Sequence, residues 1–158
     1  MAKKEEKTNV MRILDSAKIP YKSHSYADTD ALSGTEVADV LGQSYEQVFK
    51  TLVTVGKSGE HYVFAIPVDK ELDLKKAASA AGEKSIAMLK SKELLGLTGY
   101  IHGGCSPIGM KKQFRTFFDE TAELFDTIFF SAGKIGYQVE ISPSDLKKIL
   151  DFEYSDLT

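Results

Sequence analysis

Two runs of strand-forming residues joined by a short turn constrain the fold of this chain more than any other feature. Val48 to Val55 and His61 to Val68 are rich in β-branched and aromatic residues. Between them stands Gly56-Lys57-Ser58-Gly59. Two such runs around a short glycine-containing segment are typical of a β-hairpin. The sequence therefore predicts antiparallel pairing in the middle of the chain.

Short helices interrupt the strand candidates at irregular intervals. Apolar residues at helical spacing predict a helix over 8–18 that is closed by Pro20. A capping box at Ser33-x-x-Glu36 predicts a second helix, which ends at Gly42. Similar signals predict three more: one over 74–81 capped by Asp73, one over 91–95, and one that begins at Pro143 and is capped by Ser142.

The strand candidates do not alternate regularly with these helices. Besides the hairpin, the extended or strand-like segments are 21–26, 98–102, 115–118, 127–131 and 137–141. An irregular order of strands and helices favours an α+β domain over a doubly wound fold. We therefore expect a mixed, mainly antiparallel sheet surrounded by short helices.

Size and composition fit one globular domain. The chain has 158 residues, of which 42% are hydrophobic and 27% charged, and it contains no repeat, low-complexity tract or linker. We therefore expect residues 1–158 to form a single domain. No apolar run approaches the length of a membrane span, and the charged start at Met1 to Lys7 is not a secretory signal. These features predict a cytoplasmic protein that does not bind a membrane.

One cysteine and three histidines limit the redox and metal chemistry of the chain. Cys105 stands alone, which excludes an internal disulfide and multi-cysteine metal sites. His24, His61 and His102 show no metal-ligand spacing, so we expect no metal. Cys105 can act as a nucleophile if one of these histidines serves as its base, but nothing in the spacing shows that they converge. The alternative is a small residue packed inside a turn.

The charge of the chain is unevenly distributed. The net charge is -3, yet residues 50–115 hold eleven Lys or Arg against six Asp or Glu, a net +5. A basic segment of this kind can attract a polyanion such as RNA. The alternative is a solvated lysine surface without a partner.

Lys50 interrupts an apolar face of the first hairpin strand. It shares that face with Val48 and Leu52, while Phe49 and Thr51 belong to the other face. A buried ammonium group without a partner is costly, so Lys50 either reaches water at an edge or meets an anion such as a phosphate or carboxylate.

Two glycine-rich segments are the other candidate binding elements. In 103–109, Gly-Gly-Cys-Ser-Pro-Ile-Gly, backbone N–H groups can converge on an anion or a developing oxyanion. A phosphate-binding P-loop is excluded because Met110 stands where that motif requires lysine. The second segment, 131–136, lies between two strand candidates, so it does not suit a KH-type RNA clamp. For both segments, a tight turn is the structural alternative.

These motifs resemble the YbaK/EbsC family. The likeness covers nearly the whole chain, and it is most specific at Thr98 to Lys112, with further matches at Lys50, 66–76 and 131–146. The family consists of free-standing aminoacyl-tRNA deacylases, which are related to the editing domain of bacterial prolyl-tRNA synthetase. The resemblance implies a partly closed mixed sheet of six or seven strands. It also implies removal of cysteine from mischarged Cys-tRNA(Pro) without a cofactor, and prolyl-tRNA synthetase as a possible partner.

The resemblance also implies roles for individual residues. Lys50 matches the family's essential lysine, and Gly103 with its neighbours matches the loop that faces the aminoacyl ester. At three positions the chain departs from many or some relatives: His102, Ile135 and Gln138. The expected catalytic residues are Lys50, Gly103 and Gly104, and the expected substrate-binding residues are Tyr26, Thr51, Cys105, Ser106, Ser131, Gly133, Lys134 and Gln138.

The family mechanism uses the thiol of the substrate itself. Cysteine and proline are similar in size, and a hydrophobic pocket separates such near-isosteres by only about 1–3 kcal/mol. In the mechanism that the resemblance implies, the cysteinyl thiol attacks its own ester carbonyl and leaves as a thiolactone. Three functions stay open from sequence: this deacylase, a non-catalytic module that binds tRNA or the synthetase, and a hydrolase with Cys105 as nucleophile. A deacylase of this fold with another amino-acid specificity is a further variant of the first.

Overall fold

A computed structural model of the protein describes residues 7–158. The elements are α1 (Asn9–Ser16), β1 (Lys22–Ser25), α2 (Gly34–Leu41), β2 (Phe49–Gly56), β3 (His61–Pro67), α3 (Leu74–Ala81), β4 (Ile86–Met88), α4 (Ser91–Thr98), β5 (Arg115–Asp119), the 3-10 helix η1 (Glu120–Leu124), β6 (Ile128–Ser131), β7 (Tyr137–Ile141), α5 (Pro143–Leu146) and β8 (Phe152–Ser155). None of the described helices is long and apolar enough to cross a membrane. The expectation that Met1 to Lys7 is not a secretory signal falls mostly on residues 1–6, which lie outside the residues that the structure describes.

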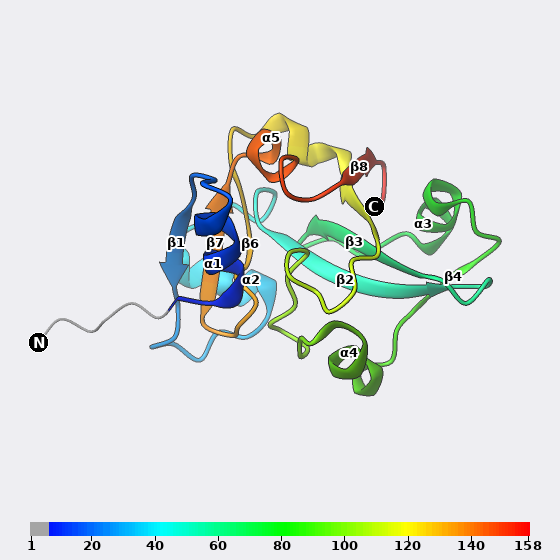
Figure 1. The fold of residues 1–158 in the computed structure, drawn as a ribbon, viewed down its shortest axis with the longest axis horizontal. Helices are drawn as coiled ribbons and strands as arrows, with labels where there is room; N and C mark the ends of the chain where they lie inside the picture. The colour runs from blue at the N-terminus through cyan, green and yellow to red at the C-terminus, as the bar shows by residue number, and fades with distance from the viewer. Residues whose placement is uncertain (1–6) are drawn as a thin grey trace, which may run out of the picture.

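The predicted hairpin forms the centre of a five-stranded sheet with the order β4-β2-β3-β5-β8 (Figure 1). β2 pairs antiparallel with both β3 and β4, and the register places Lys50 opposite Ile66. β5 pairs parallel with β3 and with β8. The hairpin and the mixed character of the sheet are confirmed.

The remaining described strands form a separate antiparallel sheet with the order β1-β7-β6. The two sheets meet at a parallel bridge between Val48, just before β2, and Phe129 in β6. The α+β class is confirmed, but the single partly closed sheet of six or seven strands is not. The strands of residues 7–158 divide between two open sheets of three and five strands, because β6 and β2 meet at one bridge only. β4 and β8, which add a strand at each edge of the larger sheet, were not expected from the sequence.

Two of the three predicted side-chain caps are present. Ser33 accepts a hydrogen bond from the Glu36 N–H, and the Glu36 carboxylate accepts from the Ser33 N–H, so the predicted capping box is present. The Asp73 carboxylate caps α3 by accepting from two backbone N–H groups. Ser142 occupies the cap position of α5 but makes no side-chain bond to that helix's backbone, since its hydroxyl pairs with Ser144 at 2.8 Å.

The strand expected at residues 98–102 is wrong. Thr98 is the last residue of α4, and its hydroxyl donates to Leu94 O at 2.7 Å. Gly99 then ends the helix with a φ of 87°, a left-handed conformation that glycine adopts without strain. The Tyr100 hydroxyl donates to Ile108 O and closes the following loop. Thr98 is β-branched and Tyr100 is aromatic, and both residue types are typical of strands. The C-cap of α4 at Gly99 determines the conformation here instead.

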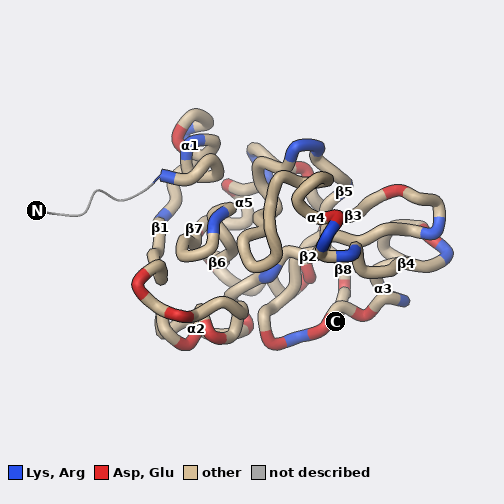
Figure 2. The backbone as a smooth tube through the Cα atoms, turned by 90° about the horizontal axis from the view of Figure 1, so that it is seen from below, with Lys and Arg blue, Asp and Glu red and all other residues tan. Residues whose placement is uncertain are grey.

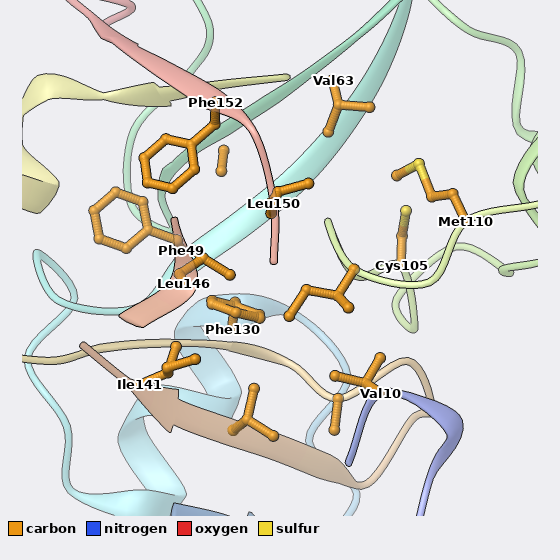
Figure 3. Close-up of a cluster of buried hydrophobic side chains, with 14 of the residues drawn as sticks. Val10, Phe49, Val63, Cys105, Met110, Phe130, Ile141, Leu146, Leu150 and Phe152 are labelled. Carbon is orange, nitrogen blue, oxygen red and sulfur yellow. The ribbon is translucent and has the colours of Figure 1, made fainter. Parts of the chain in front are cut away.

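The main core lies between the two sheets. It includes Phe49 from β2, Phe130 from β6 and Ile141 from β7, and Leu146 from α5 packs on them (Figure 3). A second core covers the opposite face of the large sheet, where the alanines of α3 pack on Phe64 and other residues. The hydrophobic cores thus hold β2 from both faces, while part of one edge stays open.

Candidate functional site

A gap along one edge of β2 forms the candidate site. At the start of β2, β6 lies beside it at the bridge between Val48 and Phe129. At the other end, the Leu89 N–H donates to Val53 O at 3.1 Å, and β4 pairs with the strand beyond that point. No described strand pairs with this edge at residues 49–52. The two flanking strands therefore frame an opening about four residues long.

The main-chain groups of Thr51 point into this gap. In an antiparallel pair, successive residues turn their N–H and C=O groups alternately toward the partner and away from it. The Val68 N–H donates to Val48 O at 2.9 Å, and the Gly56 N–H donates to Glu60 O at 2.8 Å. Even-numbered residues of β2 therefore face β3, and Thr51 turns its N–H and C=O toward the open edge.

A cavity of about 520 Å³ occupies the gap. Its walls come from β2, from α2 and the loop before it, from α4, and from the ends of β6 and β7. This volume suits a small-molecule group. None of its described lining residues is Asp or Glu. The residues singled out from sequence that the structure brings together here are Tyr26, Lys50, Thr51, His102, Gly103, Cys105, Ser131 and Gln138.

Lys50 is the only Lys or Arg among the described residues that line the cavity. The structure gives its ammonium group no hydrogen bond or ion pair within residues 7–158. Burial lowers the pKa of Lys50, while the carboxylates of Glu71 and Asp69 act in the opposite direction. A half-buried ammonium group that has no such partner in the described chain favours an anion from outside.

Thr51 contributes a second group without a partner among the described residues. Its hydroxyl oxygen is fully buried and makes no hydrogen bond. An unsatisfied buried polar atom costs about 1–3 kcal/mol, so native proteins rarely keep one without a reason. The N–H and the C=O of Thr51 therefore give a ligand at the open edge two points of attachment, and the unsatisfied hydroxyl belongs to the same residue.

The first glycine loop reaches the cavity at Gly103. This residue has a φ of 87° and forms part of the wall together with Cys105. Neither the Gly103 N–H nor the Cys105 N–H bonds to another described residue. The Gly104 N–H, by contrast, donates to Ile101 O at 3.0 Å and so is already used. Of the three N–H groups from Gly103 to Cys105, those of Gly103 and Cys105 are therefore left for an anion.

Four of the expected site residues do not line the cavity. Gly104 is buried behind its wall, and Ser106 is fully buried with its hydroxyl 3.4 Å from the Ile108 N–H. Gly133 packs so closely that an added Cβ would lie 3.0 Å from Tyr100, and its N–H donates to the hydroxyl of Ser131 at 3.1 Å. The ammonium group of Lys134 lies 5.7 Å from the ring centre of Tyr137. The structure therefore gives these four residues no place in the cavity wall.

Gln138 lines the cavity but is already paired. Its amide exchanges two hydrogen bonds with Gln43, at 2.7 and 2.9 Å, and only 2% of its surface is exposed. This pair fastens the segment after α2 to β7. No local signal in the sequence points to Gln43, because its partner Gln138 stands 95 positions away.

The predicted nucleophile lies in an unreactive setting. Burial raises the pKa of the Cys105 thiol to about 12, so it is protonated at neutral pH. Of the three histidines, only His102 shares the cavity, while His24 pairs with Glu140 at 2.9 Å and His61 packs 5.4 Å from a phenylalanine ring. Within the described residues, no group of three or more His, Cys, Asp or Glu side chains is placed to hold a metal ion.

Comparisons with known proteins agree with this architecture. The model of the aminoacyl-tRNA editing domain family matches residues 29–149. A protein of Enterococcus faecalis is 47% identical over the whole of this chain and 98% of its own length. The name of that relative, EbsC, describes it as a proposed Cys-tRNA(Pro)/Cys-tRNA(Cys) deacylase.

More distant similarities point the same way. The proline–tRNA ligase of Fervidobacterium nodosum is 27% identical over 60% of this chain, and the match covers 18% of the ligase. The crystal structure of a proposed trans-editing enzyme for prolyl tRNA synthetase superposes with a TM-score of 0.77 at 26% identity. That match covers 87% of this chain and 86% of the other.

Proposed function

The chain belongs to the family of aminoacyl-tRNA editing domains, and from this membership we propose that it removes cysteine in trans from mischarged Cys-tRNA(Pro). The amino acid and the tRNA come from the name of the full-length Enterococcus faecalis relative. We also propose that residues 1–158 form one deacylase domain that needs no cofactor, that it acts in the cytoplasm, and that prolyl-tRNA synthetase is its partner. The similarity to proline–tRNA ligases supports that last point.

One observation carries the proposal: the gap in the edge of β2 gathers polar groups that have no partner among the described residues. Lys50 and Thr51 lie on the strand, and Gly103 and Cys105, whose N–H groups bond to no other described residue, line the cavity from the glycine loop. An ester-linked amino acid on a ribose phosphate supplies an anion for the ammonium group and a carbonyl oxygen for the N–H groups. The cavity thus matches the chemistry of an aminoacyl-tRNA end.

The described lining supplies no strong nucleophile of its own. It contains no carboxylate to activate water, and the thiol of Cys105 is protonated. A cysteinyl ester brings its own thiol, with a pKa near 8.5, of which a few per cent is thiolate at neutral pH. The sulfur attacks the ester carbonyl, a C–S bond forms, and the C–O bond to the ribose breaks. The ribose oxygen takes up a proton, and water later hydrolyses the cysteine thiolactone.

The residues of the cavity position this reaction. The four-membered thiolactone ring is strained, so the thiol and the carbonyl must be held in attack geometry. In our proposal, the N–H groups of Gly103 and Cys105 stabilise the oxyanion, and Lys50 anchors the phosphate of the terminal adenosine. Thr51 holds the aminoacyl group at the open edge of β2.

A substrate panel with three variants tests the proposal. We would measure release of amino acid from Cys-, Ala- and Pro-tRNA(Pro) under single-turnover conditions. Wild type is expected to discharge the cysteinyl substrate alone. Lys50→Ala removes a charged contact worth about 1.5–3 kcal/mol, so its rate should fall about 10- to 100-fold. Cys105→Ala should stay within about threefold of wild type. Lys70→Ala, at an exposed lysine that does not line the cavity, is the matched control.

Each alternative has its own signature in this panel. Discharge of the alanyl substrate at a similar rate would mean that the protein supplies the nucleophile or activates water. Loss of activity in Cys105→Ala would favour the hydrolase in which Cys105 is the nucleophile. No discharge of any substrate by wild type would favour a non-catalytic binding module.

A further inference from the structure

The two sides of the cavity carry opposite charge. Residues 27–46, which contain α2, hold five Asp or Glu and no Lys or Arg. Residues 89–112, which contain α4 and the glycine loop, hold four Lys and one Glu. Figure 2 shows the acidic segments along α2 and basic segments at α4. A polyanion that reaches the cavity is therefore repelled from one side and attracted to the other.

The lysines on the α4 side adjoin the cavity wall. Leu89 and Ser91 line the cavity, and their chain neighbours Lys90 and Lys92 are exposed. Lys90 occupies the cap position of α4 but gives it no side-chain hydrogen bond. Cations at the start of a helix oppose its dipole, so local helix stability does not account for this pair.

A second pair of lysines lies at the other end of α4. The Lys111 N–H donates to Thr98 O at 2.9 Å, and its side chain passes over Gly99. Lys112 follows, with its ammonium group 5.8 Å from the ring centre of Phe114. A helix of eight residues is about 12 Å long, so the two pairs are separated by about that distance.

None of the four ammonium groups is neutralised within residues 7–158. The structure gives no ion pair to Lys90, Lys92, Lys111 or Lys112, and all four residues are exposed. We call these four residues the basic rim. Four exposed cations near the two ends of α4, a helix whose Ser91 and Leu94 line the cavity, form an electrostatic footprint that suits a phosphate backbone.

We propose that the basic rim binds backbone phosphates of the RNA stem whose aminoacylated end enters the cavity. This inference rests on the proposed function and adds the direction of approach: the stem lies over α4 and away from α2. The exposed side chains of Leu95 and Ile101, also on this side, suit a protein partner, but the unpaired charge favours RNA. Phosphate contacts position a nucleic acid without reading its sequence.

The test measures binding of deacylated tRNA(Pro) at several salt concentrations. The site variants are Lys90→Gln with Lys92→Gln, Lys111→Gln with Lys112→Gln, and all four changes together. Lys75→Gln with Lys148→Gln removes the same charge as each pair, from α3 and from the segment after α5, which lie on the opposite side from α4 (Figure 1). Removing one lysine that binds a phosphate reduces the slope of log K against log salt by about 1.

The expected result is specific to the rim. Each rim pair should weaken tRNA binding on the order of tenfold and reduce the salt slope by about 2. The four-lysine variant should bind about a hundredfold more weakly than wild type, because sites this far apart act independently. The single-turnover rate at saturating tRNA should stay at the wild-type value for every variant.

Two results would overturn the inference. Equal affinity and slope in the rim and control variants would show that the stem lies elsewhere. Unchanged tRNA binding with loss of association with prolyl-tRNA synthetase would assign the rim to a protein. Failure of the deacylase proposal is recorded separately, as the absence of discharge by wild type, and leaves the salt slopes interpretable.

Discussion

Thr51 and Thr54 lie three positions apart on β2, and of the two hydroxyl groups only that of Thr54 has a hydrogen-bond partner among the described residues. The Thr54 hydroxyl is buried and donates to Tyr62 O at 3.0 Å. The Thr51 hydroxyl is buried at the cavity and has no partner among the described residues. Since a protein keeps an unsatisfied buried group at a cost, we propose that Thr51 belongs to the binding site and Thr54 to the scaffold.

We expect substitution of the two threonines by valine to have opposite effects. Thr51→Val removes an unsatisfied hydroxyl, so the free energy of unfolding should be unchanged or higher, while the deacylation rate falls about tenfold. Thr54→Val removes a satisfied bond, so it should cost about 1 kcal/mol and keep the rate. Urea denaturation and single-turnover assays measure both. A destabilised Thr51→Val with wild-type activity would place Thr51 outside the site.

At the scale of elements, α2 is held against the cavity by close packing. Gly34 begins this helix, and a Cβ added there would lie 2.3 Å from a methyl carbon of Val68. The other end of α2 is fastened through Gln43 and Gln138. Side chains from α2 therefore form a fixed wall of the cavity, and that wall depends on the absence of a side chain at one position.

Two glycine-to-alanine substitutions test this packing. Gly34→Ala forces overlap with a β-branched side chain, so it should lower the free energy of unfolding by about 1–3 kcal/mol. Gly96→Ala lies inside α4, where an added Cβ meets nothing within 4 Å, so it should raise that free energy by about 0.5–1 kcal/mol. Thermal or urea unfolding measures both changes. A neutral Gly34→Ala would mean that α2 moves freely.

Local signals predicted most elements but not their assembly. The capping box at Ser33 and the cap at Asp73 determine their helices through contacts within four residues, so the sequence reveals them. β4 and β8 are short edge strands whose conformation depends on pairing with β2 and β5. The gap at residues 49–52 depends on where β6 and β4 stop beside β2, so the sequence reveals Lys50 and Thr51 but not why they are accessible.

At the scale of the whole molecule, the two open sheets explain why a site exists at this place. Their bridge lies where Val48 meets Phe129, and the open edge of β2 continues past that bridge without a described neighbour until β4 begins. The acidic and basic sides of the resulting cavity come from segments more than forty residues apart in the chain. The arrangement of the two sheets therefore forms the cavity and leaves it open at the edge of β2. The opposite charges of its two sides favour the approach of RNA from the α4 side.

The most direct test of the account compares Cys-tRNA(Pro) with Ser-tRNA(Pro), which differ by one atom in the side chain. The thiol is partly ionised at neutral pH and a serine hydroxyl is not, so only the cysteinyl ester carries its own nucleophile. We expect wild type to discharge Cys-tRNA(Pro) under single-turnover conditions while Ser-tRNA(Pro) decays at the rate without protein. Equal discharge of both substrates would contradict attack by the substrate thiol and would require a nucleophile from the protein or from water.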